Sequence, residues 1–196
     1  MAKVTREAII DAAIHLFNKN GYHATSMQDI ARAVAIKKPS IYHHFDSKEA
    51  ILLTILETGM DYLIREVEEI VSIDQDCISK LKAAIQVHAR YISENPEGAA
   101  VFLHEDRGLG EAYLESYLAK RDHFERLFRS IIQQGIDEGV FRQTDVPISV
   151  RALLGMVNWM TRWYRPQGRL NATEIAALFT DLFLNGLQRG DSPGAG

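Results

Sequence analysis

A short stretch of hydrogen-bond donors between residues 37 and 48 could bind a polyanion. The donor-bearing residues are Lys37, Lys38, Ser40, Tyr42, His43, His44 and Lys48. Ammonium, hydroxyl and imidazole groups donate to phosphate oxygens, and they can reach base edges in the major groove of DNA. The only large apolar residues among them are Ile41 and Phe45, four positions apart. A short helix here would bury these two side chains and turn its donors outward.

Two short helices joined by a tight turn must position these donors. Apolar residues recur at helical spacing before the turn, at Met27, Ile30, Ala31 and Val34. Thr25 or Ser26 can cap this first helix, and the turn falls on Ala35–Lys37. The second helix begins at Lys38-Pro39, because proline suits a first helical turn. This pattern predicts a helix-turn-helix that reads double-stranded DNA.

A third helix is expected to complete the module. It spans Thr5–Asn20, with Thr5 as N-cap and Gly21 just after its end. Asp46 or Ser47 then caps a long helix that continues to about Ser72. Residues 1–48 are therefore predicted to form a three-helix DNA-binding domain.

The stretch ATSMQDIARAVAIKKPSIYHHFDSKEAIL resembles the DNA-binding signature of the TetR family of transcriptional regulators. The resemblance covers the first quarter of the chain and is carried by Ile30-Ala31, Ile41–Phe45 and Ser47-Lys48-Glu49. Where the family often has glycine, this chain has Ala35–Lys37 in the turn and Lys38-Pro39 after it.

Each residue of the module has an expected role. We expect Lys38 and Tyr42 nearest to base edges, with Lys37, Ser40 and His43 also at the DNA. The side chains expected to hold phosphates are Thr25, Ser26, His44 and Lys48. Ile41 and Phe45 are expected to be core.

Charge and cysteine content narrow the function classes. Residues 1–48 hold seven Lys/Arg and four Asp/Glu, a net +3, while the remaining fifteen and twenty-two give −7. The basic part coincides with the helix-turn-helix, although a modest asymmetry is common and does not decide the function alone. The single cysteine, Cys77, excludes an internal disulfide and a multi-cysteine zinc site, and it fits a reducing cytoplasm. No signal peptide and no membrane-spanning segment are expected.

The rest of the chain is predicted to be helical, giving an all-α fold of about nine helices. After the helix that ends near Ser72, the expected helices span about 77–94, 96–106, 111–138, 147–164 and 171–187. No segment alternates with the period of two that strands require. We expect residues 49–189 to form an effector-binding and dimerisation domain, and residues 190–196 to be a disordered tail.

The last two expected helices, the eighth and ninth, carry wide apolar faces. Sequence alone allows these faces to be intrachain core. The TetR resemblance implies instead a homodimer in which these helices form a four-helix bundle. Two recognition helices related by a two-fold axis would read a palindrome with half-sites roughly 34 Å apart.

Aromatic and polar residues in the middle of this domain are candidates for an effector site. They are His88, Tyr91, Phe102, His104, Tyr117, Phe124, Phe128, Asn158, Trp159, Arg162 and Trp163. Aromatics at helical spacing are explained equally well as core, so the site follows from the resemblance. Asp137–Arg142 and Gly155–Tyr164 are similar to a TetR subgroup that senses acyl-CoA thioesters. Arginines that could meet CoA phosphates are Arg107, Arg162, Arg165 and Arg169.

Enzyme and metal chemistry find little support. His43 and His44 are adjacent and diverge on a helix, and His104-Glu105 lacks the second histidine of a zincin motif. No Walker loop or nucleophile elbow is present. We therefore predict no enzyme activity, no metal and no cofactor.

Together with these patterns, the TetR resemblance implies a cytoplasmic, ligand-responsive repressor. An apolar effector, with an acyl-CoA as a candidate, would move the long fourth helix, change the spacing of the two recognition helices and release the operator. The alternative is a helical small-molecule-binding protein that has lost DNA binding. The intact Lys38, Tyr42 and Lys48 argue against it.

Overall fold

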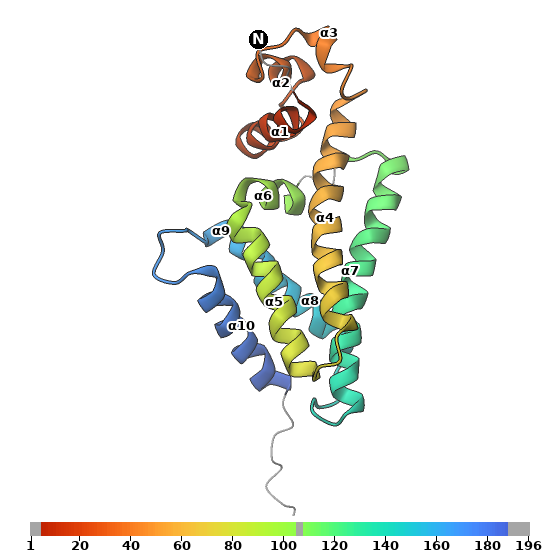
Figure 1. Cartoon of the computed structure of the whole chain (residues 1–196), viewed down its shortest axis with the longest axis vertical. Coiled ribbons are helices and arrows are strands. Elements are labelled where there is room, and N and C mark those ends of the chain that lie inside the picture. The colour runs from red at the N-terminus through yellow and green to blue at the C-terminus, as the bar shows by residue number, and fades with distance from the viewer. Residues whose placement is uncertain (1–4, 105–107, 188–196) are drawn as a thin grey trace, which may run out of the picture. The chain divides into compact units, whose positions relative to one another are not determined.

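The structure, a computed structural model, describes residues 5–104 and 108–187, and this part of the chain is helical with no strand (Figure 1). Its helices are α1 (Arg6–Asn20), α2 (Met27–Ala33), α3 (Lys38–Ile41), α4 (Lys48–Ser72), α5 (Cys77–Glu94), α6 (Pro96–His104), α7 (Glu111–Asp137), α8 (Val146–Asn158), α9 (Met160–Trp163) and α10 (Ala172–Leu187). The all-α prediction is confirmed. The described residues form ten helices, one more than expected, because the helix predicted from Pro147 to Tyr164 breaks after Asn158.

The chain divides into two compact units. The first comprises the chain up to Tyr62 together with Asn95–Arg121, and the second comprises Leu63–Glu94 and the chain from Asp122 onward. Both α4 and α7 therefore contribute residues to each unit.

The first unit contains the helix-turn-helix. α1 contacts α2 and α6, and α2 contacts α3. The predicted caps form: Thr5 accepts from the amide of Ala8, and Gly21 follows α1 at φ 83°. Ser26 and Asp29 form a reciprocal capping box at the start of α2. Of the two candidates for α4, Ser47 is the cap, since its hydroxyl accepts from the amide of Ala50 at 3.0 Å.

The second unit is organised around α5. α10 lies along α5, and α8 contacts both helices (Figure 1). Asp76 caps α5 by accepting from the amide of Ser79 at 2.9 Å. Asn171 and Glu174 form the predicted capping box of α10, with the two amide bonds at 2.8 and 3.0 Å. These local caps fix where the core-lining helices begin.

The expected division at residue 48 coincides with the start of α4, but the compact unit that holds the helix-turn-helix also includes more of α4, α6 and the start of α7. A functional boundary between 1–48 and 49–189 stays a prediction. The expected tail, 190–196, and the expected end of the helix over 96–106 lie outside the described residues.

Candidate nucleic-acid interface and effector region

The turn of the helix-turn-helix is closed by a Schellman motif. The amide of Ile36 donates to the Ala31 carbonyl at 2.9 Å, and the amide of Ala35 donates to the Arg32 carbonyl at 3.1 Å. Ala35 occupies the position after the helix cap in a left-handed conformation, at φ 57°. This turn sets the direction in which the chain enters α3.

α3 ends at Ile41, short of the expected end at Phe45, and the helix with the turn after it buries the apolar pair and exposes the donors. Ile41 is fully buried and Phe45 nearly so, and the Arg6 guanidinium lies 4.2 Å from the centre of the Phe45 ring. These two residues are core, as expected. The residues expected to read DNA are exposed at Lys37, Lys38, Tyr42 and His43 and half-buried at Ser40 and His44.

The hydroxyls of two expected phosphate ligands, Thr25 and Ser26, are hydrogen-bonded to other groups of the chain. The Thr25 side chain is buried and donates to the Leu16 and Gly21 carbonyls. The Ser26 hydroxyl donates to the Asp29 carboxylate at 2.6 Å and accepts from the Asp29 amide. These bonds also hold the pKa of Asp29 below its ordinary value. The placement of Thr25 and Ser26 as phosphate donors is therefore not supported by the geometry.

Lys48 is also directed into the fold. Its Nζ donates to the Tyr22 and Thr25 carbonyls, both at 2.6 Å, and lies 4.1 Å from the centre of the Tyr22 ring. Lys48 thus holds the turn between α1 and α2. Its expected role as a phosphate ligand stays a prediction.

A cluster of expected effector residues lies inside the second unit. The His88 ring is 3% exposed and meets the edge of Phe124 at 5.5 Å, and Phe124 meets Phe128 at 5.2 Å. Nδ1 of His88 and Oδ1 of Asn158 are buried without a hydrogen-bond partner among the described residues. Burial lowers the pKa of His88 to about 4. The cluster is aromatic, neutral and contains unsatisfied polar atoms.

The other expected effector residues lie elsewhere. Phe102 and Tyr117 belong to the first unit, where their rings meet at 6.2 Å. Tyr91 is half-buried, while Trp159, Arg162 and Trp163 are exposed. The side chain of His104 and all of Arg107 lie outside the described residues.

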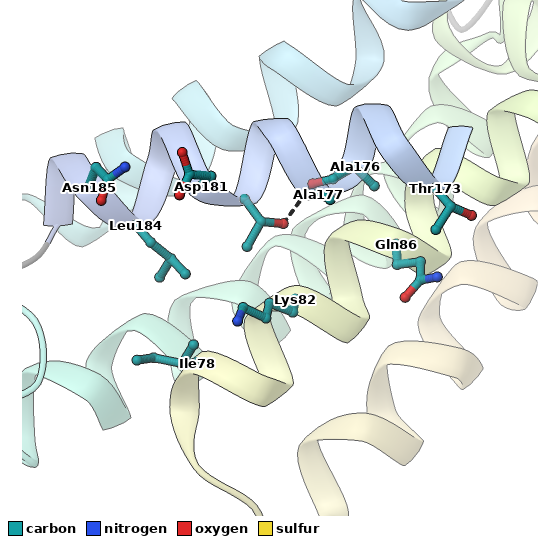
Figure 2. A pocket seen from close by; sticks show the side chains of 10 residues that line it. Ile78, Lys82, Gln86, Thr173, Ala176, Ala177, Asp181, Leu184 and Asn185 are labelled. Atoms are coloured by element: carbon teal, nitrogen blue, oxygen red, sulfur yellow. Dashed lines mark hydrogen bonds between the residues drawn. The ribbon is translucent and has the colours of Figure 1, made fainter. Parts of the chain in front are cut away.

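Two hollows occur on the second unit. One, of about 390 Å³, is lined by Trp163, Tyr164, Arg165, Gly168, Arg169, Leu170, Ile175, Leu178 and Phe179. The other, of about 570 Å³, lies between α5 and α10 (Figure 2). Its lining is Ile78, Lys82, Gln86, Thr173, Ala176, Ala177, Thr180, Asp181, Leu184 and Asn185.

Comparison with known proteins gives the family. A model of the bacterial regulatory proteins of the tetR family matches residues 9–55, and a tetracyclin repressor-like C-terminal domain matches residues 74–187. The chain belongs to the TetR family of transcriptional regulators. It is a DNA-binding regulator and not an enzyme.

Several known proteins are similar to this chain over at least 90% of its length. The HTH-type transcriptional repressor KstR2 of Rhodococcus jostii (strain RHA1) is 32% identical over 93% of this chain and 90% of its own length. The structure of PfmR from Thermus thermophilus has a TM-score of 0.84 and 39% identity, covering 92% of this chain and 99% of that one. AibR, solved in complex with isovaleryl coenzyme A and operator DNA, has a TM-score of 0.83 and 28% identity, covering 90% and 96%.

Sequence reasoning missed the polar lining of the larger hollow in this TetR-family regulator. Lys82, Gln86 and Asp181 are exposed residues on amphipathic helices, a pattern that is usually a solvated face. Within residues 5–104 and 108–187, no three His, Cys, Asp or Glu side chains gather as metal ligands. None of the described helices is long and apolar enough to cross a bilayer.

Proposed function

We propose that this TetR-family protein is a homodimeric repressor that leaves a palindromic operator when it binds a coenzyme A thioester. The observation that carries the DNA-binding part is the open donor surface of the helix-turn-helix. It consists of Lys37, Lys38, Ser40, Tyr42, His43 and His44. Because Ile41 and Phe45 are buried on the opposite side of this segment, its donors face outward, where they can enter the major groove. The same surface argues against a protein that has lost DNA binding.

The proposed dimer face consists of apolar side chains on the last helices. Ile148, Trp159 and Leu182 are 58–65% exposed. They lie on α8, at the α8–α9 break and on α10, the segments that the family resemblance assigns to a four-helix bundle. Exposed large apolar side chains gathered on neighbouring helices are typical of a surface that another protein covers. A second copy of the chain would bury them and supply the second recognition helix.

The chemistry of the second unit supports a CoA thioester as effector. The hollow of about 390 Å³ combines the rings of Trp163 and Phe179, which meet at 6.4 Å, with Arg165 and Arg169. Aromatic faces stack on a purine base, and guanidinium groups pair with phosphates. Leu170 and Ile175, which line the same hollow, offer apolar surface to an acyl chain. AibR supports this proposal as a relative that binds isovaleryl coenzyme A and operator DNA.

Release of the protein from DNA by an acyl-CoA tests whether a CoA thioester is the effector. A labelled duplex, selected from random sequences by the protein itself, is titrated with isovaleryl-CoA and with longer saturated acyl-CoAs while fluorescence anisotropy is followed. We expect release by at least one acyl-CoA and a weaker response in an Arg165→Ala/Arg169→Ala variant. Arg126→Ala, which removes an exposed arginine of α7, is the matched control and should respond normally. A duplex that stays bound at every acyl-CoA concentration would refute the thioester proposal.

A further inference from the structure

The segment that carries the proposed DNA-reading side chains, residues 38–44, has little regular structure to hold its orientation. α3 is four residues long, and Lys37 at its N-cap makes no side-chain capping hydrogen bond. The chain then turns, and the amides of His44 and Phe45 both donate to the Ile41 carbonyl at 3.0 Å. A single helical turn is not stable alone. The orientation of residues 38–44 therefore depends on contacts from other elements.

Arg6, the first residue of α1, makes such a contact at the end of this segment. Its guanidinium lies 4.2 Å from the centre of the Phe45 ring, and Phe45 is 3% exposed while Arg6 is exposed. Nη2 of Arg6 also donates to the Thr54 hydroxyl of α4 at 3.4 Å. That hydroxyl donates in turn to the Ala50 carbonyl at 2.8 Å, which orients it as an acceptor. One side chain thus joins α1, the turn after α3 and α4.

α1 itself gives no local reason for an arginine at this position. A cation in the first helical turn lies at the positive end of the helix dipole, where an acidic residue such as Glu7 is favoured. The side chain of Arg6 is exposed and does not belong to the buried face of α1. The contact with Phe45 does give a reason, because a planar guanidinium stacks on an aromatic ring better than an ammonium does.

We propose that Arg6 is a positioning residue for sequence recognition, which orients Tyr42 and His43 toward the bases by stacking on Phe45. The proposal rests on the reading of DNA by residues 38–44, and it is independent of the dimer and of the effector. The competing account is that Arg6 binds a phosphate directly, since a guanidinium carries five N–H donors. The two accounts differ in which duplexes lose affinity when Arg6 is replaced.

Affinities for two duplexes separate the accounts. One duplex is selected from random sequences by the wild-type full chain, and the other has the same length and composition in scrambled order. In Arg6→Ala the affinity for the selected duplex should fall by about threefold to tenfold, the range of one exposed cation–π contact. The affinity for the scrambled duplex and the salt dependence of binding should stay at wild-type values. Equal losses on both duplexes, with a salt slope lower by about one, would overturn the proposal in favour of a phosphate contact.

Two further variants separate the planar group from its charge. Arg6→Lys keeps the charge and loses the planar group, so it should lose nearly as much affinity for the selected duplex as Arg6→Ala does. Arg126→Ala removes an exposed arginine of α7 and should keep wild-type affinity for both duplexes. Wild-type affinity of Arg6→Lys for the selected duplex would overturn the stacking role.

A double-mutant cycle assigns the effect to the Phe45 ring. Phe45→Leu keeps an apolar side chain and removes the aromatic face, so Arg6→Ala should cause no further loss of affinity in that background. Circular dichroism and thermal melting establish first that each variant is folded. Losses that add in the double variant would show that Arg6 acts elsewhere, and the proposal would fail. If Phe45→Leu does not fold, amide exchange in the free proteins takes the place of the cycle.

That exchange measurement also distinguishes failure of DNA reading from failure of the positioning role. A chain that selects no duplex would refute the DNA-binding part of the proposed function. The stacking contact would still predict exchange of the His44 and Phe45 amides that is about threefold to tenfold faster in free Arg6→Ala than in the free wild type, as measured by NMR. Equal exchange in the two free proteins would refute the positioning role.

Discussion

Ala35 holds a left-handed conformation, at φ 57°, in a turn where glycine is usual. A non-glycine residue in this conformation lowers the stability of the fold by about 1 kcal/mol. A glycine avoids this loss, but it also gives the unfolded chain more conformational entropy, which offsets part of the gain in stability. Ala35→Gly should therefore raise the free energy of unfolding by up to about 0.5 kcal/mol. Urea denaturation measures it. Ala33→Gly, at the exposed last residue of α2, should instead lower stability, and equal losses in both variants would contradict this account.

His88 should make the protein sensitive to acid. Burial lowers its pKa to about 4, whereas in the unfolded chain the pKa is about 6.5. The unfolded state therefore binds more protons between these two values, so stability is complete above about pH 6.5 and falls as the pH drops toward 4. The loss should be about 2 kcal/mol at pH 5, measured by urea denaturation across the pH range.

The His88→Phe variant isolates this contribution. Without the imidazole, the slope of stability against pH between 7 and 5 should flatten. His43→Gln removes an exposed histidine and should leave the slope unchanged. The account fails if His88→Phe and the wild type lose stability in parallel.

Lys38 and Lys48 should respond differently to the same substitution. Lys38→Ala removes an exposed charge from α3, so duplex affinity should fall and base preference should relax at the positions it reads. Lys48→Ala removes the donor that holds two carbonyls, so it should lower the melting temperature and leave the salt dependence of binding nearly unchanged. Binding isotherms at several salt concentrations and thermal melts separate the two. A large fall in salt slope for Lys48→Ala would show instead that Lys48 binds a phosphate.

The sequence predicts residue roles best where the decisive contact is local. The caps at Thr5, Ser26 and Asn171 and the buried pair Ile41 and Phe45 all depend on neighbours within four residues. Lys48 donates to carbonyls 26 and 23 residues away, and nothing in its local pattern distinguishes that from a phosphate contact. The buried polar atoms of His88 and Asn158 that lack a hydrogen-bond partner likewise depend on how α5 packs against α8, which the sequence alone does not give.

At the scale of elements, the helix bounds follow the sequence closely except at the end of α3, which stops at Ile41, and at the break between α8 and α9. Neither glycine nor proline lies at Asn158-Trp159, so no local signal marks this position. Trp159 is 63% exposed while its neighbour Met160 is fully buried. The break thus belongs to the packing of the second unit, and periodicity alone predicts one longer helix.

A charge on the exposed face of α10, the last helix, should weaken the proposed dimer. Leu182 on α10 is 65% exposed, and a glutamate there would place a carboxylate in the proposed dimer face. Leu182→Glu should shift the protein toward monomers in analytical ultracentrifugation while its helical circular dichroism is kept. Ile73→Glu changes an exposed apolar residue outside α8–α10 and should remain dimeric. A fully dimeric Leu182→Glu protein would exclude this face as the interface.

At the scale of the whole molecule, the sequence predicted a DNA-binding module followed by a helical regulatory region, and the family matches confirm that order. The division into compact units was not predictable from sequence. It depends on α6 and the start of α7, which lie far along the chain yet belong with the helix-turn-helix. This arrangement places expected effector residues such as Phe102 and Tyr117 in the same unit as α3.

The central claim is that this TetR-family protein reads a two-fold symmetric operator through α3. Selection of duplexes from a random pool by the full chain, followed by sequencing, tests it most directly. We predict enrichment of an inverted repeat with half-sites spaced by about one helical turn or a multiple of it, and no such enrichment by a Lys38→Ala/Tyr42→Ala variant. A pool that stays random, or an enriched site without two-fold symmetry, would contradict the claim.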